Sequence, residues 1–208
     1  MQYRFVTVEG AIGAGKTTLA TMLARDYNAH LILEQFENNP FLPKFYADKE
    51  RYAFPVELYF MAERYQHLKQ LLSQSDIFKS FTISDFLFQK SLIFAIQNLN
   101  DDEEKLYRTL FDIINPSLPK PDLIVYLHAP VSKLLQNIKK RGRPYEQQIS
   151  PEYLENIQAA YMSYFRSLTG QRIVLVDCTR LDWIARPEDY IFMKNLLEQP
   201  YEPGIHYR

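Results

Sequence analysis

Short apolar runs alternate along the chain with longer segments in which apolar residues recur every third or fourth position. The apolar runs lie at about residues 3–9, 30–34, 78–83, 122–127 and 173–176. They are rich in β-branched residues and have the length of strands buried on both faces. The other segments show the period of amphipathic helices. The clearest of these lie at about 51–72, 103–115, 131–140, 150–168 and 187–198. Strands alternating with helices predict an α/β fold, with a five-stranded, mostly parallel sheet covered by helices on both faces.

The length of the chain limits the number of domains. It has 208 residues, of which 47% are hydrophobic, and this is enough for one α/β core. We expect a single domain over residues 1–198. Residues 199–208 contain two prolines and a glycine, which predict an irregular C-terminal tail.

Composition excludes several classes of protein. A formal net charge of −1 argues against a general nucleic-acid binder, which needs a basic surface. No apolar run approaches the length that spans a membrane, and the chain enters a strand too early for a signal segment. Cys178 is the only cysteine, so there is no internal disulfide and no cysteine metal cluster. We therefore expect a cytoplasmic protein in a reducing compartment.

The first strand runs into Gly10-x-x-x-x-Gly15-Lys16-Thr17, and a helical pattern follows at once. Glycines let the backbone curl so that its N–H groups converge, and the helix start adds a partial positive charge. Lys16 can reach the β- and γ-phosphates, and the Thr17 hydroxyl can bind Mg²⁺. An ordinary glycine turn is the alternative, but the complete motif between strand and helix favours phosphate binding. The predicted phosphate-binding residues are Gly10, Ala11, Ile12, Gly13, Ala14, Gly15, Lys16, Thr17 and Thr18.

Two carboxylates follow predicted strands at the edge where ligands gather in such sheets. Glu34 could accept a proton from a hydroxyl or help to hold Mg²⁺, or it could be a solvated residue at a strand end. Asp85 suits a metal ligand, or it could cap the following helix.

A basic run ends the helix at 131–140, with Arg141 and Arg143 on either side of Gly142. Two guanidinium groups on a hairpin could close over a transferring phosphate, which predicts a lid at about 139–150. The alternative is that basic residues simply favour a helix C-terminus. The phosphate loop favours the lid.

Further stretches follow the phosphate loop in a specific order. They are Glu34-x-x-x-x-Asn39-Pro40-Phe41-Leu42, Tyr46, Glu50-Arg51-Tyr52-Ala53-Phe54, Arg64, Ile93-Phe94-Ala95, Arg141-Gly-Arg143-x-x-Glu146 and Pro151-Glu-Tyr-Leu154. With the phosphate loop they resemble the deoxynucleoside kinase family, in particular its bacterial deoxyadenosine/deoxycytidine kinase-like branch. The resemblance covers about residues 3–180.

That resemblance implies a kinase with a P-loop fold that transfers phosphate from ATP to the 5′-hydroxyl of a deoxynucleoside. Glu34 would be the general base, with Arg64 beside it. Phe94 would stack on the acceptor base, while Tyr46 and Glu146 would bind the 3′-hydroxyl.

The resemblance also implies the donor half of the site. Asp85 would serve Mg²⁺, with Thr17, and Arg141 and Arg143 would clamp phosphates. The segment 177–183 would lie against the ATP adenine. Members of the family are typically homodimers through helices, which the stripes at 51–72 and 103–115 could provide.

The chain departs from the family pattern at several positions. Asp85-Phe86-Leu87 stands where the family usually has Asp/Glu-Arg-Ser, so an arginine is missing. Asn137 takes the place of another lid arginine. Glu57 replaces the glutamine that reads the base, and Lys90 falls near where an aspartate often assists it.

Glu57 suggests a particular acceptor base. A glutamine amide both donates and accepts hydrogen bonds, whereas a carboxylate only accepts. The adjacent N1–H and 2-amino donors of guanine would suit Glu57, which predicts a shift toward deoxyguanosine. The alternative is an ion pair of Glu57 with Lys90 or Arg64, because a buried carboxylate is costly without a cation.

The sequence as a whole predicts an ATP-dependent deoxynucleoside 5′-kinase with Mg²⁺, in which Lys16, Arg141 and Arg143 stabilise the transferring phosphate. One alternative is a thymidylate-type nucleoside monophosphate kinase, for which Arg51, Arg64 and Lys90 could bind the acceptor phosphate. The other is a nucleotide-binding regulatory protein without catalysis, suggested by the missing arginine.

Overall fold

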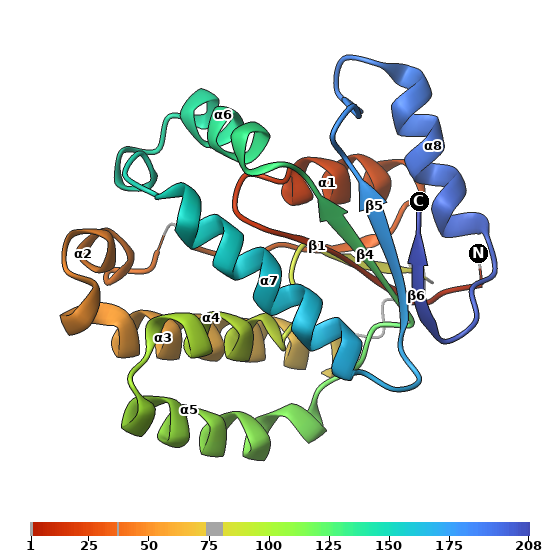
Figure 1. The fold of residues 1–208 in the computed structure, drawn as a ribbon. Coiled ribbons are helices and arrows are strands. Elements are labelled where there is room, and N and C mark those ends of the chain that lie inside the picture. Colours follow the sequence, from red (N-terminus) through yellow and green to blue (C-terminus); the bar gives the residue numbers. More distant parts are fainter. Residues whose placement is uncertain (1, 37, 74–80) are drawn as a thin grey trace.

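A six-stranded sheet forms the centre of the molecule in the computed structural model, which describes residues 2–36, 38–73 and 81–208 (Figure 1). All its strand pairs are parallel, in the order β2-β3-β1-β4-β5-β6. The strands are β1 (Phe5–Gly10), β2 (His30–Ile32), β3 (Thr82–Ser84), β4 (Leu123–His128), β5 (Arg172–Asp177) and β6 (Gly204–Tyr207).

Helices cover both faces of the sheet. In Figure 1, α1, α6 and α8 lie above the strands, and α3, α4, α5 and α7 lie on the other side. Helix α5 packs on α3 and α4 as an outer layer. The helices are α1 (Lys16–Asp26), α2 (Leu42–Ala47), α3 (Lys49–Ser73), α4 (Lys90–Asn98), α5 (Asp101–Ile114), α6 (Val131–Arg141), α7 (Pro151–Ser167) and α8 (Pro187–Glu198). None of the described helices is long and apolar enough to cross a membrane.

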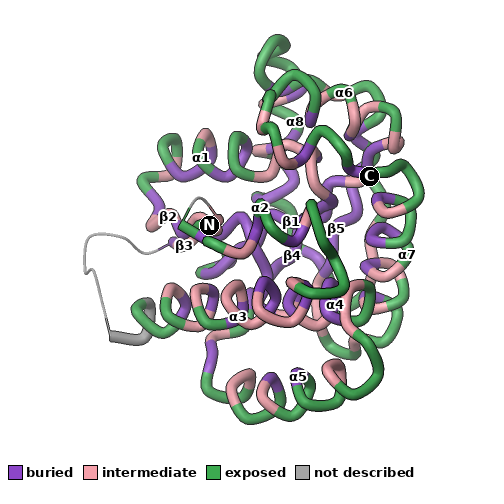
Figure 2. The backbone as a smooth tube through the Cα atoms, turned by 90° about the vertical axis from the view of Figure 1, so that its left-hand side faces the viewer, coloured by how far each residue is buried: buried purple, intermediate pink, exposed green. Residues whose placement is uncertain are grey.

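The core follows from the apolar runs. Every residue of β1 is buried, and so are the first five of β4, because helices pack on both faces of these strands (Figure 2).

Capping residues mark where the helices begin. Asn100 and Glu103 form a reciprocal capping box at α5, and the Ser150 hydroxyl accepts from the Tyr153 amide at the start of α7. The predicted α/β class with helices on both faces is therefore confirmed. The predicted strand at 78–83 begins outside the described residues, and in the described part β3 covers Thr82–Ser84.

The C-terminal segment differs from the prediction. Residues 199–208 are not an irregular tail, because Gly204–Tyr207 form β6, a sixth strand parallel to β5. The side chain of Tyr3 ties this segment to the N-terminus. Its hydroxyl donates to the Gln199 carbonyl and accepts from the Tyr201 amide, each at 2.9 Å. The prolines precede the strand without entering it, so their missing amides do not interrupt the ladder.

The strand order places the predicted chemistry at one edge. Strands β2, β3 and β1 are neighbours, so their carboxyl ends bring Glu34, Asp85 and the loop after Gly10 together. The chain leaves β1 toward β2 and later crosses to β4 on the other side of β1. Such a reversal opens a crevice at the carboxyl ends of the strands.

The sixth strand predicts a stability effect. Truncation of residues 204–208 removes the β6 ladder and exposes the edge of β5. It should lower the free energy of unfolding by about 2–4 kcal/mol, at roughly 1 kcal/mol per lost hydrogen bond. Urea denaturation followed by circular dichroism measures this, with Glu202→Ala on the exposed approach to β6 as control. Equal stability of the truncated and full chains would contradict the strand.

Candidate active site

The phosphate loop runs from Gly10 to the first turn of α1 and has little room for side chains. A Cβ on Gly13 would lie 2.7 Å from the Leu134 carbonyl oxygen, and one on Gly15 would lie 2.7 Å from the Trp183 ring. Both glycines have φ between 85° and 88°, a region that favours glycine. Neighbouring segments therefore pack directly on the loop backbone. The N-terminus of α1 faces the cavity and provides an anion site.

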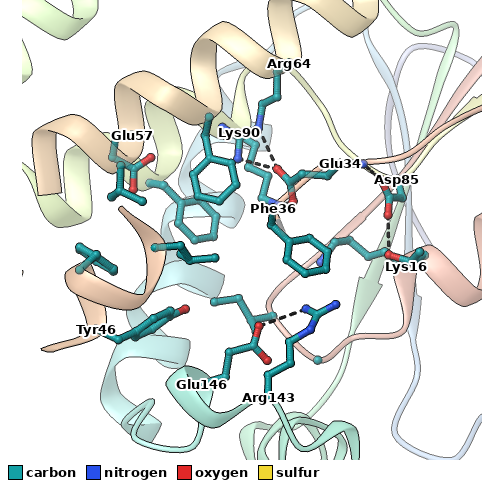
Figure 3. Close-up of a pocket in the computed structure, with 18 of the residues that line it drawn as sticks. Lys16, Glu34, Phe36, Tyr46, Glu57, Arg64, Asp85, Lys90, Arg143 and Glu146 are labelled. Carbon is teal, nitrogen blue, oxygen red and sulfur yellow. Dashed lines mark hydrogen bonds and ion pairs between the residues drawn. The ribbon is translucent and has the colours of Figure 1, made fainter. Parts of the chain in front are cut away.

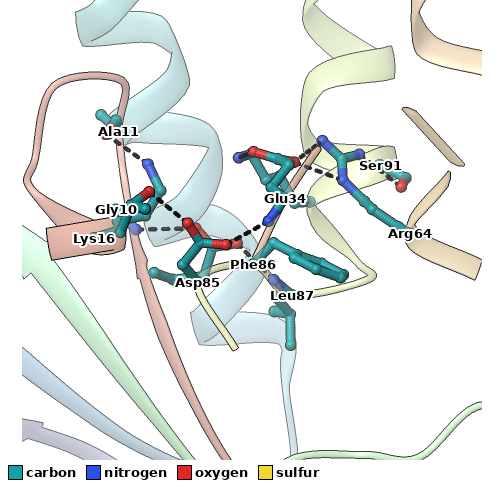
Figure 4. A network of polar contacts seen from close by, with 12 residues as sticks. Gly10, Ala11, Lys16, Glu34, Arg64, Asp85, Phe86, Leu87 and Ser91 are labelled. Atoms are coloured by element: carbon teal, nitrogen blue, oxygen red, sulfur yellow. Dashed lines mark hydrogen bonds and ion pairs between the residues drawn. The ribbon is translucent and has the colours of Figure 1, made fainter. Parts of the chain in front are cut away.

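Asp85 joins the loop to the edge of the sheet (Figure 4). One of its carboxylate oxygens accepts from the Thr17 hydroxyl at 2.5 Å, and the other accepts from the Glu34 amide at 2.7 Å. Burial and the nearby charge of Glu34 raise the pKa of Asp85.

Lys16 donates to the Ala11 carbonyl at 3.1 Å. Burial and the charge of Lys90 lower the pKa of Lys16 to about 8, so it is still mainly protonated at pH 7.

The Glu34 carboxylate lies between two cations (Figure 3). Arg64 donates to Oε1 through Nε and Nη2, at 2.8 and 2.6 Å, and Lys90 donates to Oε2 at 2.5 Å. Burial opposes ionisation of Glu34, but the charges of Lys90 and Arg64 outweigh it and lower the pKa. Glu34 is therefore a carboxylate, and it lies in the same cavity as Lys16 and Thr17.

Glu57 lies on α3, on the far side of the cavity from Lys16 (Figure 3). Its Oε1 accepts from the Asn98 amide at 2.7 Å, while Oε2 is buried and has no hydrogen-bond partner within the described chain. Burial raises the pKa of Glu57 to about 7. The alternative ion pair is not formed, because Lys90 and Arg64 both contact Glu34 instead.

The lid at about 139–150 borders the cavity through Arg141, Arg143 and Glu146. Both Arg141 and Arg143 form ion pairs with Glu146, and the Arg143 guanidinium lies 3.7 Å from the centre of the Phe36 ring. Asn137 does not act as an arginine would. Its side-chain amide donates to the Gly13 carbonyl at 2.8 Å and so supports the phosphate loop.

The cavity brings the predicted residues together. The predicted substrate and catalytic residues all line it, and aromatic or aliphatic side chains fill the spaces between them. The predicted residues are Lys16, Thr17, Glu34, Tyr46, Glu57, Arg64, Asp85, Lys90, Phe94, Arg141, Arg143 and Glu146. Burial and nearby Tyr153 raise the pKa of Tyr46, so its hydroxyl stays protonated.

A second, wider hollow opens from the phosphate loop toward residues 178–185. Leu181, Asp182 and Trp183 line it, as expected for a segment beside the donor base. Lys133 shapes this segment, because its ammonium group donates to the carbonyls of Cys178 at 2.5 Å and Leu181 at 2.7 Å. Both cavities are lined by the phosphate loop. A ligand in the wider hollow can therefore reach a ligand in the first cavity across this loop.

Several residues of the site were not predicted. Asn98 holds Glu57, Ser91 accepts from Arg64 at 2.8 Å, and Phe36 lies under Arg143. Asn98 and Ser91 lie on α4, whose N-terminal turn contains Lys90, and one face of this helix meets the cavity. A search for polar residues on that face would have found them. The stacking of Phe36 depends on how the lid folds back, and no sequence pattern signals it.

The cleft combines a phosphate loop, a carboxylate at the end of the next strand and an arginine-containing lid. This combination is typical of an enzyme that transfers phosphate from a nucleotide to a second substrate, here one with an apolar part. The family model for deoxynucleoside kinases matches residues 6–199, and the chain belongs to this family. It is therefore a phosphotransferase that phosphorylates deoxynucleosides, as the sequence predicts.

Curated relatives agree with this assignment, and a solved structure agrees with the fold. A deoxyguanosine kinase of Bacillus subtilis is 36% identical over 193 residues, which cover 89% of this chain and 92% of the relative. A deoxyadenosine/deoxycytidine kinase of the same organism is 32% identical and covers 76% and 75% of the two chains. The structure of a deoxyadenosine kinase from M. mycoides superimposes with a TM-score of 0.80, at 24% identity over 93% of this chain and 98% of the other, which supports the fold.

Family membership argues against both alternatives. A regulatory protein without catalysis is not supported, since the family consists of kinases. A monophosphate kinase is not supported either, since the matching family model and the curated relatives above are deoxynucleoside kinases. Arg51, one of the residues expected to bind an acceptor phosphate, is exposed and packs against the ring of Tyr52.

The burial of Glu57 predicts a pH-dependent stability. Its pKa is about 7 in the folded state and 4.5 in the unfolded state, so the folded state holds more protons between these values. Wild-type stability should therefore fall by about 2–3 kcal/mol as the pH rises from 4 to 8 through this group alone. Glu57→Gln removes this loss, so its stability relative to wild type should increase over that pH window.

Urea denaturation of both proteins at pH 5 and pH 8 checks this, with Glu63→Gln on the same helix as control. A difference between Glu57→Gln and wild type that does not change with pH would contradict the raised pKa.

Proposed function

We propose that the chain transfers the γ-phosphate of ATP to the 5′-hydroxyl of a deoxynucleoside, with Glu34 as general base. The observation that carries this proposal is that Glu34 lines one cavity with Lys16 and Thr17 of the phosphate loop. A hydroxyl placed beside Glu34 would lie next to the end of a triphosphate held by the loop. Such positioning supplies most of the catalysis in phosphoryl transfer.

Glu34 suits a proton acceptor that acts late in the reaction. Its lowered pKa makes it a weak base toward a free alcohol, whose proton is far less acidic. As the bond from the hydroxyl oxygen to phosphorus forms, that oxygen loses electron density and its proton becomes acidic. The carboxylate then takes the proton, while the bond between the γ-phosphorus and the bridging oxygen breaks. In this role Glu34 mainly orients the hydroxyl.

Cations stabilise the transferred group. Lys16 and the amides at the start of α1 would hold the β- and γ-phosphates. Arg141 and Arg143 are on the lid and pair with Glu146, which is buried. A bound triphosphate would compete for these guanidinium groups and draw the lid over the cleft, with bidentate contacts on the phosphate oxygens.

Thr17 and Asp85 form an oxygen donor pair that fits Mg²⁺. The hydroxyl and the carboxylate are 2.5 Å apart beside the phosphate loop, and hard oxygen ligands are those that Mg²⁺ prefers. We propose that Thr17 binds the ion and that Asp85 holds it, directly or through water. Bound there, Mg²⁺ would neutralise charge on the β- and γ-phosphates.

Glu57 supports deoxyguanosine as the acceptor. Glu57 lines the cavity, its Oε2 has no partner within the described chain and its Oε1 is held by Asn98, so the carboxylate could accept from two neighbouring donors of a base. N1–H and the 2-amino group of guanine are such a pair. Relatives named deoxyguanosine kinase occur in Bacillus subtilis and, at 30% identity over 209 residues, in Lactobacillus acidophilus. Phe94 would stack on the base, while Tyr46 and Glu146 would bind the 3′-hydroxyl.

We also propose that the chain acts as a homodimer in the cytoplasm. Apolar residues of α5 lie on two faces in the structure, because Tyr107 and Phe111 are buried while Leu106 and Ile113 are exposed, by 53% and 71%. A second copy of the chain would cover this outer apolar face. Size-exclusion chromatography with light scattering on Ile113→Glu would show a monomer if this face forms the interface.

The central experiment measures phosphoryl transfer from ATP and Mg²⁺ to the four deoxynucleosides and their monophosphates. Wild type should phosphorylate nucleosides, and Lys16→Ala and Glu34→Gln should each lower kcat by about 10²–10⁴. Lys105→Met, an exposed substitution on α5, is the control. A wild type as inactive as Lys16→Ala on every acceptor would refute the kinase activity. Transfer to monophosphates alone would refute the proposal that a deoxynucleoside is the acceptor.

The guanine proposal predicts a change of base preference. Glu57→Gln should lower kcat/KM for deoxyguanosine by about 10–100-fold, because the amide NH₂ meets a donor of the base. Activity with deoxyadenosine should fall less or rise. KM for deoxyguanosine with wild type should also decrease as the pH rises through about 7, when Glu57 ionises. An unchanged order of preference in Glu57→Gln would exclude the role of Glu57.

A further inference from the structure

The two cations on Glu34 are held in different ways. Arg64 is fixed by three hydrogen bonds, two to Glu34 and one from Nη1 to the Ser91 hydroxyl. Lys90 makes one hydrogen bond within the described chain, from Nζ to Oε2 of Glu34. An ammonium group has three donors, so two of them are left for a ligand. Arg64 is thus a fixed support of the carboxylate, whereas Lys90 can turn without breaking a second contact.

Lys90 is placed at the end of the cavity where phosphate arrives. Its side chain is 6% exposed and lines the cavity with Lys16, Thr17 and Glu34 (Figure 3). The ring of Phe94 lies one helical turn further on, 5.5 Å from Nζ, and limits where the chain of Lys90 can go. The ammonium group is therefore kept on the Glu34 side, away from Glu57.

The segment between β3 and α4 offers no other cation. Phe86 is fully buried in an apolar cluster with Met61, Tyr107 and Phe111, so it cannot reach the cavity. Lys90, the first residue of α4, is the one positive charge that this segment brings to Glu34.

We propose that Lys90 is a catalytic residue that changes its partner during the reaction, from Glu34 to the phosphate being transferred. This inference rests on the proposed role of Glu34. When Glu34 accepts the hydroxyl proton, its carboxyl becomes neutral and its attraction for Lys90 is lost. The bond from the 5′-oxygen to phosphorus forms and the bond to the leaving oxygen breaks, so the negative phosphoryl group now lies beside the same ammonium group. Lys90 keeps its proton and donates to the product phosphate.

Binding measurements separate this role from simple support of Glu34. The ligands are the deoxynucleoside that wild type phosphorylates best and its 5′-monophosphate. Lys90→Met should change Kd for the nucleoside less than about threefold and weaken the monophosphate by about 10–100-fold, as a lost charge-assisted hydrogen bond requires. Lys90→Arg should restore most of the monophosphate affinity. In turnover, Lys90→Met should lower kcat by about 10²–10³ with KM for the nucleoside nearly unchanged.

Equal weakening of both ligands in a folded Lys90→Met protein would overturn the proposal, as would an unchanged affinity for the monophosphate. If Lys90→Met is unfolded, Glu34→Gln and Glu34→Gln/Lys90→Met provide a second pair without the lone buried carboxylate. The double variant should bind monophosphate about tenfold more weakly than Glu34→Gln, and equal affinities would overturn the role of Lys90. These binding tests need no turnover, so they remain distinct from a failure of the kinase activity itself.

Discussion

The buried cluster of Glu34, Arg64 and Lys90 is the interaction on which the cleft depends. A carboxylate out of water is strongly destabilising alone, and here both of its oxygens are occupied by cations from α3 and α4. Those two helices are thereby fixed against the end of β2. Asp85 extends the constraint, because it binds the Glu34 amide and the Thr17 hydroxyl, and so links the carboxylate to the phosphate loop. One chain of polar contacts therefore joins the acceptor half of the cleft to the donor half.

The same cluster limits the chemistry. A base held by two cations is weak but well oriented, which suits a reaction in which positioning matters more than proton abstraction. A second glutamate of the cavity, Glu57, has the opposite environment. It has an amide partner and no cation, and its pKa is raised to about 7. Glu34 and Glu57 thus differ in ionisation because their neighbours differ, and this allows one to serve the hydroxyl and the other the base.

Much of the fold could be predicted from the sequence, because the apolar runs and the phosphate loop are local patterns. The alternation of strands and helices also implied which strand ends would meet, and this brought Glu34 and Asp85 together. The partners of long side chains could not be predicted in this way. Lys90 was expected near Glu57, but its Nζ lies on Glu34, since the direction of a lysine depends on the start of α4 and on Phe94. The strand β6 was missed because four residues after two prolines form a strand only when the edge of β5 is available.

The contact of Tyr3 with the C-terminal segment has a consequence for how the protein forms during synthesis. The hydrogen bonds of its hydroxyl join residues 196 and 198 positions apart. Such contacts close only after residues 199–201 have left the ribosome, and distant contacts of this kind form slowly. The phosphate loop, Glu34, Asp85 and the lid all lie within residues 10–150. The cleft can therefore take shape on the nascent chain while β5 still lacks its neighbour, and the edge of the sheet is the last part to be completed.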